Sequence, residues 1–271
     1  MAEAVEPPFD RPDAQFNLLP GWTWVGCYGG YYLQADLLAG FEHGFFTRQW
    51  QGRGPDVLAG YLSAGVSVHR PQQVHSAVVL PASAARSDPW PEADGLVSDA
   101  GGQSLWVCGA DCTPVLIADP DTGQVAACHA GWRGVAGQIL KGAVERLEHQ
   151  GCQRSALLVA LGPAISGARY QVDAPVAEAI AASLGACGDG EWSTRGREPS
   201  ELDGVLQPDP QPGRWRLDIR AAASLQLQQL GLNPQQLALC PLCTASEPLL
   251  FHSWRRDQRK AVQWSGIVSQ A

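Results

Sequence analysis

The chain has 271 residues, of which 45% are hydrophobic and 17% are charged, the composition of a globular protein with a sizeable core. Its net charge is −8, from 19 basic and 27 acidic residues, which argues against a nucleic-acid-binding protein. No apolar run approaches the roughly 20 residues that a membrane-spanning helix requires, so we expect no membrane partner either.

The first 20 residues combine prolines and acidic residues with little periodicity, which predicts a poorly ordered leader (1–20) ahead of a single catalytic domain (21–271). Such a start lacks the basic residues and the apolar stretch of a signal peptide. The eight cysteines therefore belong to a chain without an export signal, in which buried thiols or metal ligands are more common than disulfides. We expect a cytoplasmic protein.

Strand patterns come first along the chain. Aromatic and β-branched residues at 22–38 surround Gly29-Gly30, which predicts two strands joined by a tight turn, and residues 41–48 predict a third strand. The clearest strands follow at 105–108, 115–118 and 125–129. Between the last two, Asp119–Gly123 combines proline and glycine as hairpin turns do, so these two strands should pair.

Helical patterns are interspersed with strands in the C-terminal half. Helices are expected at 135–147, between the capping residue Asp173 and Gly185, and at 218–230. A buried strand is expected at 157–161, a long variable loop at 186–213 and a last buried strand at 237–240. Because strands and helices mix without strict βαβ alternation, the predicted fold class is α/β (α+β), a single-domain mixed β-sheet sandwich flanked by helices.

Two histidines and one cysteine, His75, Cys112 and His129, stand in short strings whose neighbours constrain the backbone. Two imidazole nitrogens and one thiolate suit a catalytic zinc site, in which a fourth position is left to water or substrate. Taken singly each residue has a weak claim, because a lone histidine is usually a satisfied polar residue and a strand-end cysteine a small buried hydrophobe.

The predicted hairpin brings two of these residues together. Pro114 disfavours helix just before it, so Cys112 should be extended and lie just ahead of the first hairpin strand. His129 closes the second strand, and these two strand ends meet at the same edge of a sheet. Cys128 should point to the opposite face because side chains alternate along a strand. The placement of Cys108 stays open.

The loop Gly131–Gly134 leads directly into the helix expected from Val135. A helix N-terminus offers free N–H groups and a partial positive charge, and Arg133 adds a fork of donors. Together they would suit a phosphate or carboxylate group beside the metal. A water-capped helix start with a surface arginine explains the same residues equally well.

Five strings carry a family resemblance: Gln73–His75, Ala110–Pro114, His129–Gly134, Leu161–Ile165 and Ser253–Asp257. They closely resemble the family long labelled laccase-like polyphenol oxidases and now also described as purine nucleoside phosphorylases with adenosine deaminase activity. The resemblance runs from about His43 to the C-terminus. It implies a zinc ion held by His75, Cys112 and His129, and purine nucleosides and phosphate as substrates: phosphorolysis of adenosine, guanosine, inosine and methylthioadenosine, with deamination of adenosine.

The copper-oxidase label can be tested by counting ligands. A multicopper oxidase holds several coppers mainly through closely spaced histidines, whereas this chain has six histidines and no His-x-His pair. A single copper could still replace zinc at a His-Cys-His site. For deamination zinc would activate water, with Asp94 and Asp111 as candidate catalytic residues that shuttle protons or orient the histidines. For either aspartate, capping of a turn is the alternative.

Phosphorolysis also requires arginines that hold phosphate against the anomeric carbon of the ribose. Arg133 is the first candidate, followed by Arg48 and then by Arg255 or Arg256. The leading hypothesis is thus a zinc-dependent purine nucleoside phosphorylase with adenosine deaminase activity. Three alternatives stay open: a metal-dependent hydrolase that edits a cell-wall precursor, a copper-containing phenol oxidase, and a non-enzymatic interaction protein in which a closed four-ligand zinc staples loops.

Overall fold

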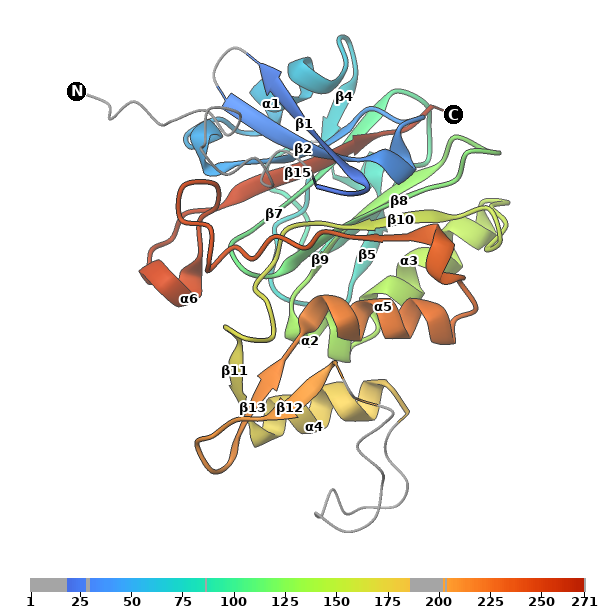
Figure 1. Cartoon of the computed structure of the whole chain (residues 1–271). Helices are drawn as coiled ribbons and strands as arrows, with labels where there is room; N and C mark the ends of the chain where they lie inside the picture. The colour runs from blue at the N-terminus through green and yellow to red at the C-terminus, as the bar shows by residue number, and fades with distance from the viewer. Residues whose placement is uncertain (1–18, 28–29, 86, 186–201, 203, 271) are drawn as a thin grey trace, which may run out of the picture.

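The computed structural model describes residues 19–27, 30–85, 87–185, 202 and 204–270. The leader expected at 1–20 therefore lies almost wholly outside the described residues. Two six-stranded sheets pack face to face, and helices cover both outer faces (Figure 1). This architecture confirms the predicted mixed β-sheet sandwich flanked by helices.

The first sheet has the strand order β1-β2-β3-β15-β7-β4. Its strands are β1 (Trp22–Cys27), β2 (Gly30–Ala35), β3 (His43–Phe46), β15 (Gln263–Val268), β7 (Gln103–Gly109) and β4 (Ser67–His69). β1 and β2 pair antiparallel up to Cys27 opposite Gly30, which confirms the two predicted strands, while residues 28–29 of the predicted turn lie outside the described residues. β15, which the sequence patterns did not indicate, pairs with both β3 and β7 in the middle of the sheet.

The second sheet has the order β14-β10-β8-β9-β6-β5. Its strands are β14 (Leu237–Leu239), β10 (Leu158–Leu161), β8 (Thr113–Ala118), β9 (Val125–Ala130), β6 (Gly95–Val97) and β5 (Val79–Pro81). β8 and β9 form the predicted antiparallel hairpin, with Pro114 opposite His129. The strand predicted at 237–240 is confirmed as β14, but it is neither buried nor last, because it lies at the sheet edge with Leu239 40% exposed and β15 follows it.

A third, smaller sheet of β11 (Gln171–Asp173), β13 (Arg214–Leu217) and β12 (Leu206–Pro208) lies at one end of the molecule with α4 (Ala174–Ser183) (Figure 1). Asp173 caps α4 as predicted, since its carboxylate accepts the N–H of Val176. The loop expected at 186–213 is wrong at β12, which pairs with β13. Residues 186–201 and 203 lie outside the described residues.

The remaining helices are α1 (Pro55–Leu62), α2 (Trp132–Ala136), α3 (Ile139–His149), α5 (Ile219–Gln229) and α6 (Trp254–Asp257), with short 3-10 helices at Asp36–Leu38, Arg48–Trp50, Ala82–Ala84 and Pro234–Gln236. The single helix predicted from Val135 is in fact two helices. Gln138 has a φ of 64° and ends the first, and a Cβ on Gly137 would lie 2.8 Å from that of Ala77. The break therefore lets the chain approach the loop that carries His75.

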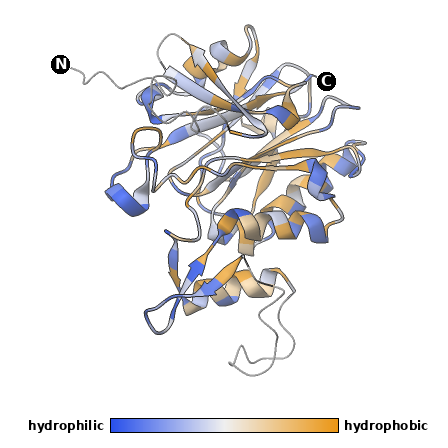
Figure 2. Cartoon of the chain, viewed as in Figure 1, coloured by the Kyte–Doolittle hydropathy of each residue, from blue (hydrophilic) through white to orange (hydrophobic). Residues whose placement is uncertain are grey.

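Alternation along β8 divides its side chains between two cores. Val115 and Ile117 face the core shared with α3 and α5, whereas Leu116 and Ala118 face the core between the two sheets. A third cluster surrounds Trp106 on the α1 side of the first sheet. Figure 2 shows the hydrophobic residues concentrated along these inner strands and helix faces, while α6 is hydrophilic.

None of the helices within the described residues is long and apolar enough to cross a membrane.

Candidate metal centre

The structure brings together the three residues singled out in the sequence. Cys112 directly precedes β8, His129 lies near the end of β9, and His75 lies in the loop before β5. The ligand atoms of the three side chains all lie within 4.8 Å of one another. The two imidazole rings have centroids 5.0 Å apart and are nearly perpendicular, at 81°. Three ligand atoms this close together form a group that could hold one metal ion.

Asp94, fully buried beside β6, organises both histidines through one carboxylate. Its Oδ1 lies 2.9 Å from Nδ1 of His129 and accepts the N–H of His75 at 3.1 Å. Its Oδ2 accepts the N–H of Val74 at 3.2 Å and the N–H and hydroxyl of Ser76 at 2.6 and 2.8 Å. With the proton of His129 on Nδ1, Nε2 is left to bind a metal. The same carboxylate holds His75 at its unusual φ of 60°.

The electrostatics of the centre favour a thiolate at Cys112. Burial by itself would raise the pKa of this thiol, but the charge and hydrogen bond of His129 and the hydrogen bond of His75 outweigh burial and lower the pKa to about 6. Burial likewise opposes charge on His129, yet Cys112 and Asp94 raise its pKa to about 9. Against burial, hydrogen bonds from His129 and Ser76 lower the pKa of Asp94 to about 2.

Gly131 provides the space that the thiolate occupies. A Cβ built on this residue would lie 2.9 Å from Sγ of Cys112 and 3.5 Å from Cδ2 of His75. Any larger residue would therefore push the sulfur or the imidazole out of place. This contact gives a physical reason for the glycine in the string His129–Gly134.

Two other cysteines lie close in sequence but have different surroundings. Cys128 is fully buried in the core shared with α3, on the face that strand alternation predicts, and burial raises its pKa to about 12. Burial also raises the pKa of Cys108 to about 12, and its backbone N–H and carbonyl both bond to the Gln73 side chain at 2.7 Å. Among the described residues, only His75, Cys112 and His129 form a group of metal-ligand type. The donor set is thus that of an open site with three protein ligands.

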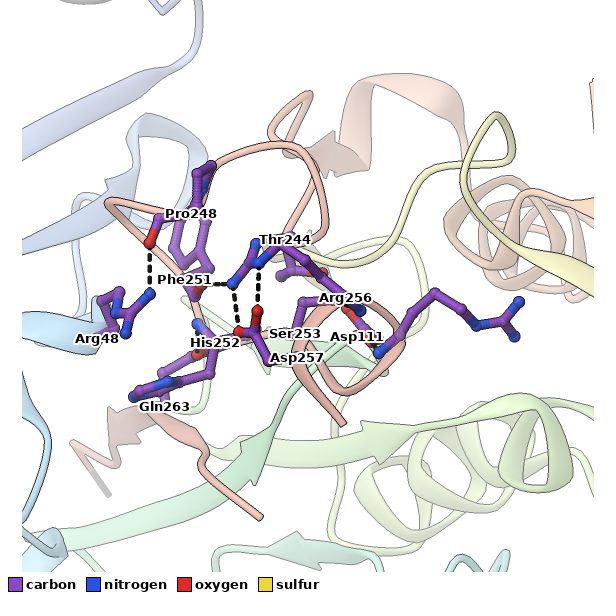
Figure 3. A network of polar contacts seen from close by, with 11 residues as sticks. Arg48, Asp111, Thr244, Pro248, Phe251, His252, Ser253, Arg256, Asp257 and Gln263 are labelled. Carbon is purple, nitrogen blue, oxygen red and sulfur yellow. Dashed lines mark hydrogen bonds and ion pairs between the residues drawn. The ribbon is translucent and has the colours of Figure 1, made fainter. Parts of the chain in front are cut away.

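Asp111 has different partners from the histidines that the sequence suggested. This residue has a φ of 98°, and its carboxylate accepts the Thr244 hydroxyl at 2.6 Å and the backbone N–H of Arg255 at 2.7 Å (Figure 3). The residue before Cys112 thereby anchors α6 to the metal centre. These contacts resemble the turn-capping alternative, although the capped residues lie more than 130 positions away.

Two of the four predicted phosphate-binding arginines hold the backbone. Arg256 forms a two-pronged pair with Asp257 and donates to the carbonyls of Thr244 and Phe251 at 2.7 and 2.8 Å. Arg48 donates to the carbonyl of Pro248 at 2.6 Å (Figure 3). Both guanidinium groups therefore stabilise the loop between β14 and α6.

The other two arginines are exposed. Arg255 places its guanidinium 5.1 Å from the centre of the Tyr170 ring and donates to the carbonyl of Gln171 at 2.8 Å. Arg133 lies over the Trp132 ring at 4.4 Å. Since α2 has only five residues, the helix N-terminus expected to assist Arg133 is a single turn.

Tyr170 is a residue of this region that the sequence analysis missed. Burial raises the pKa of its hydroxyl, and the charge of Cys112 raises it further, while Arg255 and Arg133 act in the opposite direction. Tyr170 is therefore close enough to the thiol and to both exposed arginines to feel their charges. A single tyrosine between two predicted elements gave no signal in the sequence.

A small hollow of about 10 Å³, room for a single water molecule, reaches Cys112 from the side of the first sheet. Three phenylalanines contribute to its walls, Phe45, Phe46 and Phe251, together with the polar side chain of Gln263. One side of Cys112 is therefore bordered by aromatic rings of the first sheet and of the loop that carries Phe251.

Comparison with known proteins identifies a family that matches most of the chain. Residues 56–269 match the family model described as multi-copper polyphenol oxidoreductase laccase. The chain belongs to this family. The match confirms the resemblance drawn from the five sequence strings.

Several relatives in the family are named for a different activity. A protein of Synechocystis sp. named purine nucleoside phosphorylase slr1573 is 41% identical over 258 residues, which cover 92% of this chain and 97% of the relative. Purine nucleoside phosphorylase YlmD of Bacillus subtilis is 34% identical over 176 residues, 65% of this chain and 58% of the relative. The crystal structure of YlmD from Geobacillus stearothermophilus superposes with a TM-score of 0.74 at 26% identity, covering 89% of this chain and 96% of that one.

Proposed function

We propose that the protein is a cytoplasmic, zinc-dependent purine nucleoside phosphorylase that also deaminates adenosine. Its substrates would be adenosine, inosine, guanosine and methylthioadenosine, together with phosphate. The observation that carries the proposal is the convergence of His75, Cys112 and His129 within 4.8 Å, a set of three ligands of the kind that catalytic zinc sites use. The name of the Synechocystis relative, which aligns over nearly its whole length, supports the phosphorylase half.

The donor set fits zinc. His75, Cys112 and His129 would hold the ion, and the low pKa of Cys112 provides the thiolate form that zinc binds. Bound there, zinc would supply Lewis-acid activation of the reacting groups. Asp94 keeps the Nδ1 proton on His129 and fixes the His75 backbone. Because each of its oxygens already accepts hydrogen bonds from the protein, we assign Asp94 an orienting role rather than proton transfer.

In phosphorolysis, a phosphate oxygen forms a bond to the anomeric carbon of the ribose while the bond from that carbon to the purine nitrogen breaks. The electron pair leaves with the purine, which takes up a proton, and ribose 1-phosphate remains. The arginines at the rim would hold the phosphate opposite the leaving base.

In deamination, water adds its oxygen to the amino-bearing carbon of adenine and ammonia leaves, giving inosine from adenosine. Both reactions need a nucleoside near the same ligand trio. A shared site would therefore lose both activities when one metal ligand is changed.

The direct test is to incubate the purified protein with adenosine and phosphate and separate the products by chromatography. We expect adenine with ribose 1-phosphate, and inosine, and we expect neither from the Cys112→Ala variant. Elemental analysis of the same preparation should find about one zinc per chain. If neither product forms in the wild type, or if Cys112→Ala performs equally well, the proposal fails.

The family description also raises copper-dependent phenol oxidation. Two of the four remaining histidines speak against a multicopper cluster: the buried rings of His43 and His69 lie 2.8 and 2.6 Å from the backbone carbonyls of Phe41 and Ala82. Oxygen uptake with a phenol and added copper, compared with phosphorolysis of the zinc-loaded protein, separates the two activities. The three-ligand centre likewise gives no support to a closed zinc staple, and nothing in the site favours a cell-wall precursor.

A further inference from the structure

The hydroxyl of Tyr170 is a hydrogen-bond donor near the metal centre. Its ring is half-buried, and within the part of the chain that the structure describes no hydrogen bond engages its hydroxyl. One side of the ring packs against the core shared with α3 and α5, and this contact fixes the position of the ring. A fixed hydroxyl without a protein partner is available to a ligand.

Arg255 reaches Tyr170 from α6. The guanidinium lies 5.1 Å from the ring centre, and one of its nitrogens donates to the carbonyl of Gln171. Its other N–H groups have no hydrogen-bond partner among the described residues. Its backbone N–H donates to Asp111, the residue before Cys112. This arginine is therefore tied to the metal centre through its backbone and oriented by Tyr170 and Gln171 through its side chain.

Arg133 belongs to α2, a segment far from α6 in the sequence. It comes two residues after Gly131, whose Cβ position would lie 2.9 Å from Sγ of Cys112. Stacking on Trp132 at 4.4 Å directs the guanidinium, and among the described residues it has no ion-pair partner. The charges of Arg133, Arg255 and Cys112 all act on Tyr170, so the two guanidinium groups lie in the same region as this hydroxyl.

Arg48 and Arg256 differ from Arg133 and Arg255 in the use of their guanidinium groups. Four of the five N–H groups of Arg256 are used by Asp257 and two backbone carbonyls, and Arg48 supports the carbonyl of Pro248 (Figure 3). Phosphate binding at Arg256 would require breaking these contacts, and one N–H group of Arg48 is already directed at the Pro248 carbonyl. Arg133 and Arg255 need no such rearrangement.

We propose that Tyr170, Arg133 and Arg255 form an oxyanion clamp that binds the phosphate co-substrate beside the metal centre, and that Arg48 and Arg256 only build the loop that supports it. The proposal rests on the proposed function for the identity of the anion. Guanidinium forks bind tetrahedral oxyanions through paired hydrogen bonds, and the tyrosine hydroxyl supplies a further donor. A nucleoside, which is uncharged at its sugar and base, would not require this concentration of cationic donors.

The experiment is a calorimetric titration of inorganic phosphate into the zinc-loaded protein without nucleoside, at constant ionic strength. We compare the wild type with Tyr170→Phe, Arg133→Met and Arg255→Met. Arg146→Met, which alters an exposed arginine on α3, is the matched control for loss of one positive charge. We expect phosphate affinity to fall about 10- to 100-fold in the arginine variants, since hydrogen bonds to charged groups are worth roughly 1.5–3 kcal/mol. Tyr170→Phe should lower it about 3- to 10-fold, within the range of a single hydrogen bond, and Arg146→Met should not change it.

Steady-state kinetics then separate this proposal from the proposed function. The clamp variants should raise KM for phosphate while leaving KM for the nucleoside close to the wild-type value. If phosphorolysis occurs but Tyr170→Phe and Arg133→Met both keep the wild-type affinity and KM for phosphate, the clamp is overturned while the function stands. If the clamp residues bind phosphate but no nucleoside is cleaved, the proposed function fails and the clamp stands. A wild type that binds no phosphate, or an equal loss in Arg146→Met, also overturns the clamp.

Discussion

The two faces of the β8–β9 hairpin carry two thiols with opposite properties. On the face toward α3, Cys128 has its pKa raised to about 12 by burial, and the charge of Asp94 adds to the rise. At the edge that meets the His75 loop, the pKa of Cys112 is lowered to about 6 although burial opposes this too. Burial alone therefore does not decide the state of a thiol. The decisive difference is that Cys112 has two histidines as partners and Cys128 has none among its core neighbours.

The carboxylate of Asp94 influences both the metal centre and the buried Cys128. Asp94 raises the pKa of both Cys128 and His129 through its negative charge, and it bonds to His129 directly. Adjacent residues of β9, His129 and Cys128, thus respond to the same charge in ways that suit a metal ligand and an inert core residue respectively.

The largest expected effect is on bound zinc, when each of the two cysteines is replaced in turn. Cys112→Ala should reduce bound zinc from about one per chain to near zero, because only two protein ligands remain. Cys128→Ala should keep the zinc and cost roughly 1 kcal/mol of unfolding free energy through lost packing. Elemental analysis and urea denaturation measure the two quantities. Equal zinc content in both variants would contradict the assignment of Cys112 as a ligand.

The next effect concerns the carboxylate between the two faces. Asp94→Asn removes the charge and one acceptor position, so His129 and the His75 loop lose their common anchor. Zinc affinity, measured by competition with a chelating dye, should fall about 10- to 100-fold. Asp99→Asn is the matched control, because Asp99 also accepts hydrogen bonds from a serine, Ser83, but belongs to no metal-ligand group. A similar loss in both variants would point to general destabilisation instead.

Local sequence patterns were sufficient to predict one side of the centre. The hairpin, the meeting of Cys112 and His129 at one sheet edge, and the opposite orientation of Cys128 all follow from strand periodicity and turn chemistry, which act over a few residues. The position of His75 was implied only by family resemblance. Its φ of 60° is held by a carboxylate 19 residues away, and no local preference encodes that contact.

The other side depends on contacts between distant segments. Asp111 binds Thr244 and Arg255, more than 130 residues later, so its neighbours in sequence gave no indication of these partners. Similarly, β12 pairs with β13 inside a stretch whose glycines and prolines predicted a loop. Tyr170 becomes notable only once α6 lies beside it. Strand pairing and ring contacts of this kind are set by tertiary structure rather than by local propensity.

A smaller effect is expected where the backbone makes room for the sulfur. In Gly131→Ala the new methyl group would lie 2.9 Å from Sγ of Cys112, so the thiolate must move by a few tenths of an ångström. We expect a several-fold loss of zinc affinity and a cost of about 1–3 kcal/mol in unfolding free energy from overpacking. Gly60→Ala in α1 meets no atom within 4 Å and should instead stabilise the helix by about 0.5–1 kcal/mol. Unfolding curves of the two variants that shift in the same direction would show that the space at Gly131 is not restrictive.

The smallest effect is a pH profile of the metal-free protein, which sharpens the difference between the two thiols. The thiolate is the form that reacts with iodoacetamide, so alkylation of Cys112 should be nearly constant above its pKa of about 6 and fall as the pH drops below it. Cys128, with a pKa of about 12, should stay unmodified throughout the neutral range. His129→Gln removes the positive charge that offsets burial, so the midpoint for Cys112 should move upward, toward that of an ordinary thiol. Peptide mapping by mass spectrometry resolves the two sites, and an unchanged midpoint in His129→Gln would mean that the imidazole is not what holds the Cys112 thiolate.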